Sequence, residues 1–155
     1  MGLSDWISRF DPESEIDRIE KFIARKKSEI GFKKGIIGLS GGIDSSLTTV
    51  LAKRALSNRQ IEVVFLPEAT TPEVDRNDVE SLARKFELNV RTIELDGLVS
   101  GFEEKIEELP ELAEANLKAR IRMVMLYALA NRSGGLVIGT GNLSEWLLGY
   151  FTKYG

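Results

Sequence analysis

The chain of 155 residues is 43% hydrophobic, which is enough to build one domain around a buried core. Its 21 basic and 24 acidic residues leave a net charge of −3, which excludes a broad basic surface for nucleic acid or for an anionic membrane. The chain has no cysteine and no histidine, so its chemistry must rely on carboxylates, lysine, hydroxyls and the backbone.

The amino-terminal segment predicts a helix and no targeting signal. Asp11 can cap the first amides and Pro12 suits a first helical turn; apolar residues then recur at helical spacing until Gly31 ends the helix. The segment does not have a basic start followed by an apolar core. No apolar run reaches the roughly 18 residues that a membrane span requires. We therefore expect a cytoplasmic protein without a membrane segment.

Strands and helices are expected to alternate along the rest of the chain. The expected strands are residues 35–39, 61–66, 89–95 and 136–138, and the expected helices are 44–56, 72–86, 97–106 and 110–131, followed by a final loop from Gly139. This alternation predicts parallel pairing, because a parallel return needs a long connection. Near-continuous apolar strands are typical of a sheet covered on both faces. The expected fold class is α/β, a three-layer αβα arrangement around an open parallel sheet of about four strands.

Apolar residues at helical spacing predict which helix faces pack on the sheet. The expected inward residues are Leu47, Val50 and Leu51 in the second helix, Val79, Leu82, Ala83 and Phe86 in the third, and Ile121, Met125 and Leu129 in the long helix.

The most informative segment lies where the first strand turns into the second helix. It reads Gly38, Leu39, Ser40, Gly41, Gly42, Ile43, Asp44, Ser45 and Ser46. Two adjacent glycines let the backbone approach a ligand in conformations that a side chain forbids, and free amides at a helix start favour an anion such as pyrophosphate. The serine hydroxyls add donors. Asp44 would repel phosphate unless it holds a Mg²⁺ ion that bridges phosphate oxygens; the alternative is a glycine-rich turn that Asp44 only caps.

The sequence SGGIDSS at residues 40–46 resembles the SGGxDS signature of the N-type ATP-pyrophosphatases. These enzymes cleave ATP between its α- and β-phosphates to adenylate a substrate. The chain has neither the lysine-bearing loop of kinases and GTPases nor a GxGxxG motif of dinucleotide folds. The resemblance implies that residues 38–45 bind ATP, and that the backbone of Leu66, at the end of the second strand, holds adenine.

Two later segments are similar to the ammonia-dependent NAD synthetases. One is NLKARIRM at residues 116–123; the other runs from GTGNLSE at 139–145 to GYFTKYG at 149–155. Together with the first loop, the resemblance covers the chain from about residue 10 to its last residue. It implies that the carboxylate of deamido-NAD attacks the α-phosphate of ATP and that ammonia then displaces AMP. It also implies a homodimer.

The resemblance assigns a Mg²⁺ site to Asp44 and Glu145 and an ATP contact to Thr140. Glu145 and Thr140 follow the fourth strand, and ligands of open parallel sheets collect at the carboxyl ends of strands. The alternatives are a solvated glutamate in a first helical turn and an ordinary loop threonine.

Arg120 and Lys153 match residues that bind deamido-NAD in the family. Arg120 and Arg122 lie on opposite sides of their helix, because two residues differ by about 200 degrees of rotation. We therefore expect Arg122 to do a different job and to make only a surface ion pair.

The resemblance also implies ligands for ATP and substrate beyond residue 155. It predicts that residues 1–155 form a single ATP-pyrophosphatase-type domain that is incomplete at its carboxyl end, lacks a fifth strand, binds nucleotide weakly if at all and has little or no activity. Another N-type ATP-pyrophosphatase, such as GMP synthetase or a tRNA-modifying enzyme, and a non-catalytic nucleotide-binding or dimerisation module remain alternatives. The absence of basic patches and of metal-binding cysteines disfavours a tRNA enzyme.

Overall fold

A computed structural model describes residues 10–106 and 109–155. The expectation that the amino-terminal segment carries no targeting signal therefore concerns nine residues, 1–9, that lie outside the described part of the chain. Each expected strand and helix is present, with ends shifted by at most a few residues. The elements in chain order are α2 (Pro12–Ile30), β1 (Gly35–Gly38), α3 (Ile43–Ala55), β2 (Ile61–Phe65), α4 (Glu73–Lys85), β3 (Val90–Thr92), α5 (Asp96–Ile106), α6 (Glu111–Ser133), β4 (Leu136–Val137) and α7 (Leu143–Leu148). None of the described helices combines the length and the apolar character needed to span a membrane.

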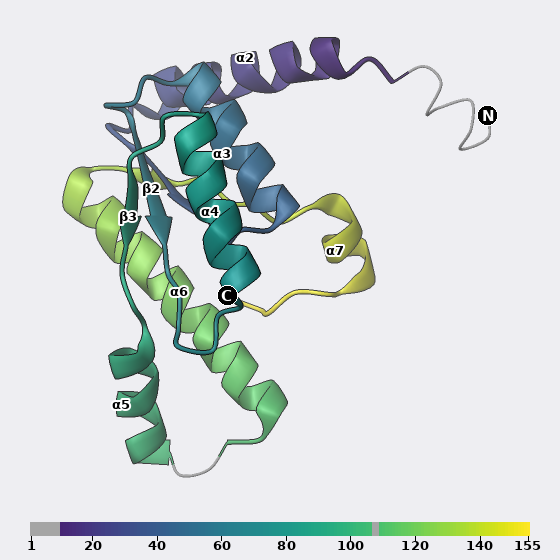
Figure 1. Cartoon of the computed structure of the whole chain (residues 1–155). Helices are drawn as coiled ribbons and strands as arrows, with labels where there is room; N and C mark the ends of the chain where they lie inside the picture. Colours follow the sequence, from purple (N-terminus) through teal and green to yellow (C-terminus); the bar gives the residue numbers. More distant parts are fainter. Residues whose placement is uncertain (1–9, 107–108) are drawn as a thin grey trace.

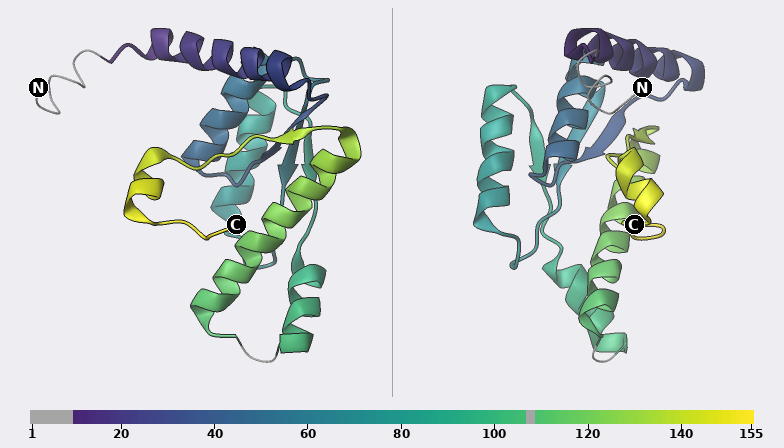
Figure 2. Two further views of the ribbon diagram at one scale, coloured as in Figure 1. Left: turned by 180° about the vertical axis from the view of Figure 1, so that it is seen from behind. Right: turned by 90° about the vertical axis from the view of Figure 1, so that its right-hand side faces the viewer.

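The four strands form one parallel sheet in the order β3-β2-β1-β4. Helices α3 and α4 lie on one side of this sheet and α6 on the other (Figure 2). The predicted three-layer α/β fold is therefore confirmed. In this order β1 lies between β2 and β4, so the loops that follow these three strands emerge side by side at one edge of the sheet (Figure 1).

The sheet divides the core into two clusters, because successive strand residues point to opposite faces. On β2, Val63 packs with Val79 of α4, whereas Val64 packs with Ile121 and Leu129 of α6. The inward faces predicted for α4 and α6 are thus confirmed for the residues that form their buried centres.

The inward face predicted for α3 is partly wrong. Leu51 is buried, but Leu47 is 53% exposed. The buried side of this helix instead begins with Ser45 and Thr49, which are four residues apart and lie above one another. Leu47 is two residues from each of them, so it points to the opposite side. The rotation of α3 thus places Ser45 and Thr49 inward together with Leu51, and leaves Leu47 outward.

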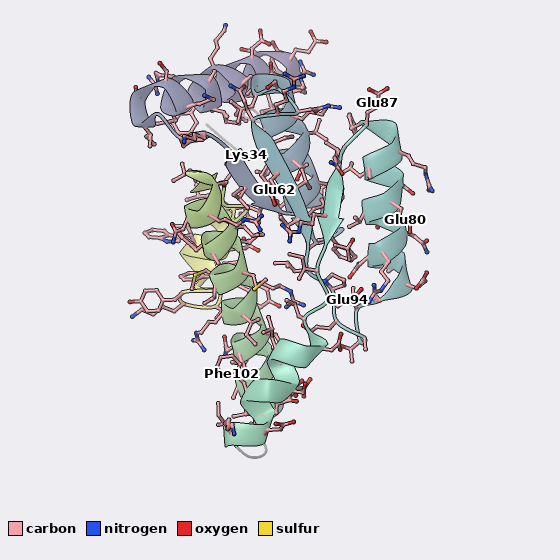
Figure 3. The ribbon with its side chains drawn as sticks, turned by 90° about the vertical axis from the view of Figure 1, so that its left-hand side faces the viewer. Lys34, Glu62, Glu80, Glu87, Glu94 and Phe102 are labelled. Atoms are coloured by element: carbon pink, nitrogen blue, oxygen red, sulfur yellow. The ribbon has the colours of Figure 1, made fainter. Side chains whose placement is uncertain are left out.

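Glu62 joins three parts of the fold through ion pairs at a partly buried position of β2. Its carboxylate lies 4.0 Å from Lys34 Nζ, 3.4 Å from Arg91 Nη1 and 3.6 Å from Arg132 Nη2. The Glu62 side chain is only 15% exposed, and Figure 3 shows it beside Lys34. One carboxylate thus compensates cations from the segment before β1, from β3 and from α6.

We expect Glu62→Gln to lower the free energy of unfolding by about 1–2 kcal/mol, because it leaves three neighbouring cations without a partly buried counter-charge. Urea unfolding followed by circular dichroism measures this loss. Glu80→Gln is the matched control: among the described residues Glu80 pairs with Arg84 of its own helix alone, 3.7 Å away, and it points into solvent from α4 (Figure 3). Its expected effect is below about 0.5 kcal/mol. Equal losses in the two variants would contradict a special role for Glu62.

Candidate functional site

A cleft of about 970 Å³ opens where the parallel strands end. Its walls come from the ends of β1, β2 and β4, from the loop before α4, from one side of α6 and from the last two residues of the chain. Ligands of open α/β sheets bind at this edge. Five of the residues predicted to bind ATP line this cleft, namely Gly38, Leu39, Ser40, Leu66 and Thr140.

Ser45 fixes the shape of the loop after β1. Its side chain is buried, and its Oγ accepts a hydrogen bond from the Ser40 amide at 3.1 Å, lies 3.0 Å from Ser40 Oγ and donates to the Gly42 carbonyl at 3.0 Å. This hydroxyl is therefore engaged inside the loop. What residue 45 can offer an anion is its backbone amide, in the first turn of α3.

We expect Ser45→Ala to lower the free energy of unfolding by about 1–3 kcal/mol, because the Ser40 amide and the Gly42 carbonyl lose a buried partner. Chemical denaturation measures the change. Ser46→Ala is the control, since the Ser46 hydroxyl makes no hydrogen bond among the described residues; its expected change is within about 0.5 kcal/mol. An equally harmless Ser45→Ala would show that these contacts do not stabilise the loop.

The two glycines of the loop have different structural roles, although the sequence predicts unusual backbone conformations for both. Gly41 has φ +93°, and a Cβ placed on it would lie 2.7 Å from the carbonyl oxygen of Asp75 in α4. Gly42 has an ordinary φ of −70° and caps α3 without a side-chain hydrogen bond. Only Gly41 requires the freedom of glycine, because both its backbone angle and its close neighbour exclude a side chain.

Asp44 and Glu145 are held by one residue, Asn142, which links the loops after β1 and β4. Asn142 Nδ2 donates to Asp44 Oδ2 at 3.3 Å, and its backbone amide donates to Glu145 Oε2 at 2.9 Å. The second oxygen of each carboxylate makes no hydrogen bond among the described residues. The predicted pair is thus brought together by the adjacency of β1 and β4.

This pair of carboxylates fits a Mg²⁺ ion that shares its coordination with a phosphate ligand. Magnesium prefers oxygen and is usually bound through one or two carboxylates together with waters and substrate phosphates. Within residues 10–106 and 109–155, no three or more acidic side chains are grouped so that they could hold a metal ion without a phosphate ligand. An ion held here would depend on the ligand in the cleft for the rest of its coordination.

Asn142 as a cap and α7 as a helix were missed from the sequence, which predicts a final loop from Gly139 and places Glu145 in a first helical turn only as an alternative. That expectation is wrong, because Asn142 and Glu145 form a reciprocal capping box at the start of α7. The signal was present in the sequence as Asn, two residues, then Glu. Glu145 therefore has a structural role in the first turn of α7 whether or not it binds a metal.

Arg120 and Lys153, the residues predicted to bind deamido-NAD, lie together at the rim of the cleft. Arg120 Nε donates to the backbone carbonyl of Lys153 at 3.2 Å, and Thr152 Oγ1 lies 2.7 Å from Asn116 Oδ1. These contacts fold the last residues back onto α6. Both side chains are exposed and neither lines the cleft, whereas the next residues, Tyr154 and Gly155, do.

Arg122 makes the predicted ion pair, but its predicted place at the surface is wrong, because its partner is a buried acid. Arg122 Nη2 donates to Glu68 Oε1 at 2.5 Å and its Nε donates to the Leu66 carbonyl at 3.1 Å, while Lys118 Nζ lies 2.9 Å from Glu68 Oε2. Glu68 is 5% exposed. All four residues line the cleft, and the Leu66 carbonyl that was expected to meet adenine already accepts a hydrogen bond. The spacing of Lys118 and Arg122, which places both on one helix face, was the available signal.

Comparisons with known proteins agree on one family. A family model described as NAD synthase matches residues 15–155. The NH3-dependent NAD(+) synthetases of Thermoplasma volcanium and Methanosarcina mazei are 41% and 44% identical to this chain over 145 and 149 residues, 94% of it in each case. The chain spans 59% and 58% of their lengths.

Two solved structures have the same fold over 94% of the chain. The NH3-dependent NAD synthetase of Campylobacter jejuni, in complex with a nitrate ion, matches with a TM-score of 0.88 at 34% identity, and 63% of it is covered. The NMN synthetase of Francisella tularensis matches with a TM-score of 0.87 at 29% identity, and 61% of it is covered.

Proposed function

The chain belongs to the NAD synthase family, and from this premise we propose that it carries the ATP site of a cytoplasmic ammonia-dependent NAD synthetase. The family resemblance expected from SGGIDSS, NLKARIRM and GTGNLSE is confirmed. The proposed reaction is amidation of deamido-NAD with ammonia, driven by ATP cleavage to AMP and pyrophosphate through an adenylated carboxylate. The observation that supports it best is the cleft at the strand ends, with the SGGIDSS loop beside the two linked carboxylates.

The loop residues are proposed to bind the leaving pyrophosphate. Ser40 and the free amides in the first turn of α3 suit this role, since negative charge builds on the bridging oxygen as the phosphates separate. Asp44 and Glu145 would hold Mg²⁺, which neutralises charge on the phosphate oxygens. The proposed ATP ligands are Gly38, Leu39, Ser40, Gly41, Gly42, Ile43, Asp44, Ser45, Leu66 and Thr140.

Arg120 and Lys153 are proposed to bind deamido-NAD. Their contact at the rim of the cleft supports a shared site, and a planar guanidinium suits a carboxylate or phosphate. The chain spans less than two thirds of the relatives' length, and the family resemblance assigns further ligands to residues beyond 155.

A homodimer is the proposed assembly. Val124 and Tyr127 on α6, and Trp146 and Leu147 on α7, which projects from the body of the molecule, are exposed and apolar (Figure 1). Light scattering after size-exclusion chromatography is expected to give twice the 17.3 kDa of one chain. A monomer at every concentration would contradict the assembly.

Calorimetric titration tests the ligand assignment. We expect the chain to bind ATP only when Mg²⁺ is present, and to bind deamido-NAD more tightly than NAD, which lacks the reacting carboxylate. Nicotinate mononucleotide is a further arm, because an NMN synthetase shares the fold. Binding of neither ATP nor deamido-NAD would contradict the proposed function. Preference for the mononucleotide would contradict the dinucleotide substrate and leave the ATP site in place.

A further inference from the structure

Glu68 is a buried acid whose position is fixed from both its backbone and its side chain. Its amide donates to Thr71 Oγ1 at 2.8 Å, and its carbonyl accepts from the Thr71 amide at 3.0 Å and from Arg76 Nη2 at 2.7 Å. Its side chain is only 7% exposed. A carboxylate removed from water to this extent must be compensated by cations or hydrogen-bond donors.

Both cations that compensate Glu68 come from α6. Each takes one carboxylate oxygen: Arg122 binds Oε1 and Lys118 binds Oε2. Arg122 is tied a second time, through Nε, to the Leu66 carbonyl at the end of β2. Lys118 is tied a second time to Glu114, one turn earlier on α6, at 2.5 Å. Two long and flexible side chains are thereby fixed on the wall of the cleft.

The two cations keep unused donors at the cleft. A guanidinium has five N–H groups, and Arg122 Nη1 has no acceptor among the described residues while the side chain is 37% exposed. The hydrogen bonds to Glu114 and then to Glu68 raise the pKa of Lys118 above its ordinary value, so the ammonium stays fully charged at neutral pH. Glu68 and Glu114 balance the charge of the cluster, so what it presents to a ligand in the cleft is the unused N–H donors of two cations in fixed positions.

We propose that Arg122 and Lys118 bind an oxyanion of the nucleotide in the cleft, and that Glu68 is the positioning residue that aims them. This inference rests on the proposed function, since it assumes a phosphate or carboxylate ligand in the same cleft. The role is distinct from that of the loop after β1, because the cations belong to α6, on the other face of the sheet. Arg120, two residues from Arg122, contacts the chain end instead.

The effect of removing the charge of Glu68 separates positioning from simple electrostatics. If Glu68 acted only through its charge, Glu68→Gln would strengthen anion binding, because a negative charge near the ligand is lost. If Glu68 positions the cations, the same change weakens binding, because glutamine offers one acceptor where two cations need one each. Glu68→Asp keeps both acceptors and is expected to restore part of the affinity.

Calorimetric titration of the full chain with Mg²⁺-ATP, deamido-NAD and NAD tests the proposal. We expect Arg122→Lys, which keeps the charge and loses the planar fork, to weaken binding about tenfold, and Glu68→Gln to weaken it by a similar factor. The matched control is Glu62→Gln, which also removes a paired acid of low exposure but lies outside the set of described residues that line the cleft. It is expected to bind ligands as the parent does, although it is less stable.

The three ligands identify the source of the oxyanion. If the variants Arg122→Lys and Glu68→Gln bind only ATP more weakly, the oxyanion is a phosphate of ATP. If they bind deamido-NAD more weakly but not NAD, it is the carboxylate of deamido-NAD. If they bind both dinucleotides more weakly, it is the diphosphate that the two share. Unchanged affinities in Arg122→Lys would overturn the ligand role, and tighter binding by Glu68→Gln would overturn the positioning role. A parent chain that binds none of the three would overturn the proposed function and this inference together.

Discussion

Replacing Gly41 by alanine is expected to abolish detectable binding of Mg²⁺-ATP and to lower the free energy of unfolding by about 2–4 kcal/mol. The backbone at this position has φ +93°, a conformation that an L side chain rarely adopts. The added Cβ would also lie 2.7 Å from the carbonyl oxygen and 3.0 Å from the Cα of Asp75, which are backbone atoms of α4 and cannot turn aside. The loop must move, and the amides that it presents to the cleft move with it. Urea unfolding and calorimetric titration measure the two effects.

The neighbouring glycine provides the control for the stability effect of Gly41→Ala. At Gly42 the φ of −70° is ordinary, and the nearest atom to an added Cβ is Ser40 Oγ at 3.4 Å. Gly42→Ala is expected to change the free energy of unfolding by less than about 1 kcal/mol. Gly101→Ala in α5, where an added Cβ meets no atom of the described residues within 4 Å, is the binding control and is expected to leave ATP affinity unchanged. A Gly41→Ala chain that binds ATP like the parent would contradict a role for the loop.

The centre of the sheet could be predicted because β1 and β2 are largely buried on both faces, unlike β3 and β4. The run that begins at Gly35 is apolar throughout, and the run that begins at Ile61 is apolar except for Glu62; both became central strands of the sheet. The first residue of α3 could also be located to within one position, since two glycines between a strand and a helix leave few conformations for the chain. In both places the local sequence and the tertiary packing favour the same structure.

The rotation of α3 and the partners of Arg122 could not be predicted, because each depends on residues far away in the sequence. Leu47 points outward because Ser45 must reach Ser40, a requirement that helical periodicity does not contain. Arg122 pairs with Glu68, 54 positions earlier, because α6 crosses the end of β2. An acid after an apolar strand is unremarkable until the fold places two cations against it.

Asn142 shows how the sheet order can connect two sites that the sequence separates by almost a hundred residues. Its side chain reaches Asp44 while its backbone amide meets Glu145. This is possible because β4 pairs with β1, with Gly35 opposite Leu136, so both loops leave the sheet at the same edge. A change in either loop therefore affects the carboxylate of the other. The two carboxylates should accordingly behave as one unit in binding experiments.

Asp44→Asn is expected to weaken Mg²⁺-dependent binding of ATP by about 100-fold and to leave stability almost unchanged. Asparagine keeps the size of the side chain and an oxygen that can accept from Asn142, so only the charge and one metal-binding oxygen are lost. Glu145→Gln is expected to have a similar effect on binding. Glutamine can still accept from the Asn142 amide, so the capping box of α7 survives and any loss of affinity reports on the cation. Titrations of ATP with and without Mg²⁺ measure the change.

The double variant decides whether both carboxylates hold the same ion. If they do, the first substitution already removes most of the cation's contribution, and the second costs little more; if they act independently, the two losses of free energy add. Glu80→Gln, an exposed acid on the far side of α4, is the control and should leave the Mg²⁺ dependence as it is in the parent. Full additivity, or a Mg²⁺ dependence that survives both changes, would contradict a shared ion. Either result would leave Asp44 as an acid in the first turn of α3 and Glu145 as the capping-box partner of Asn142 in α7, with the cation bound elsewhere or by the phosphates alone.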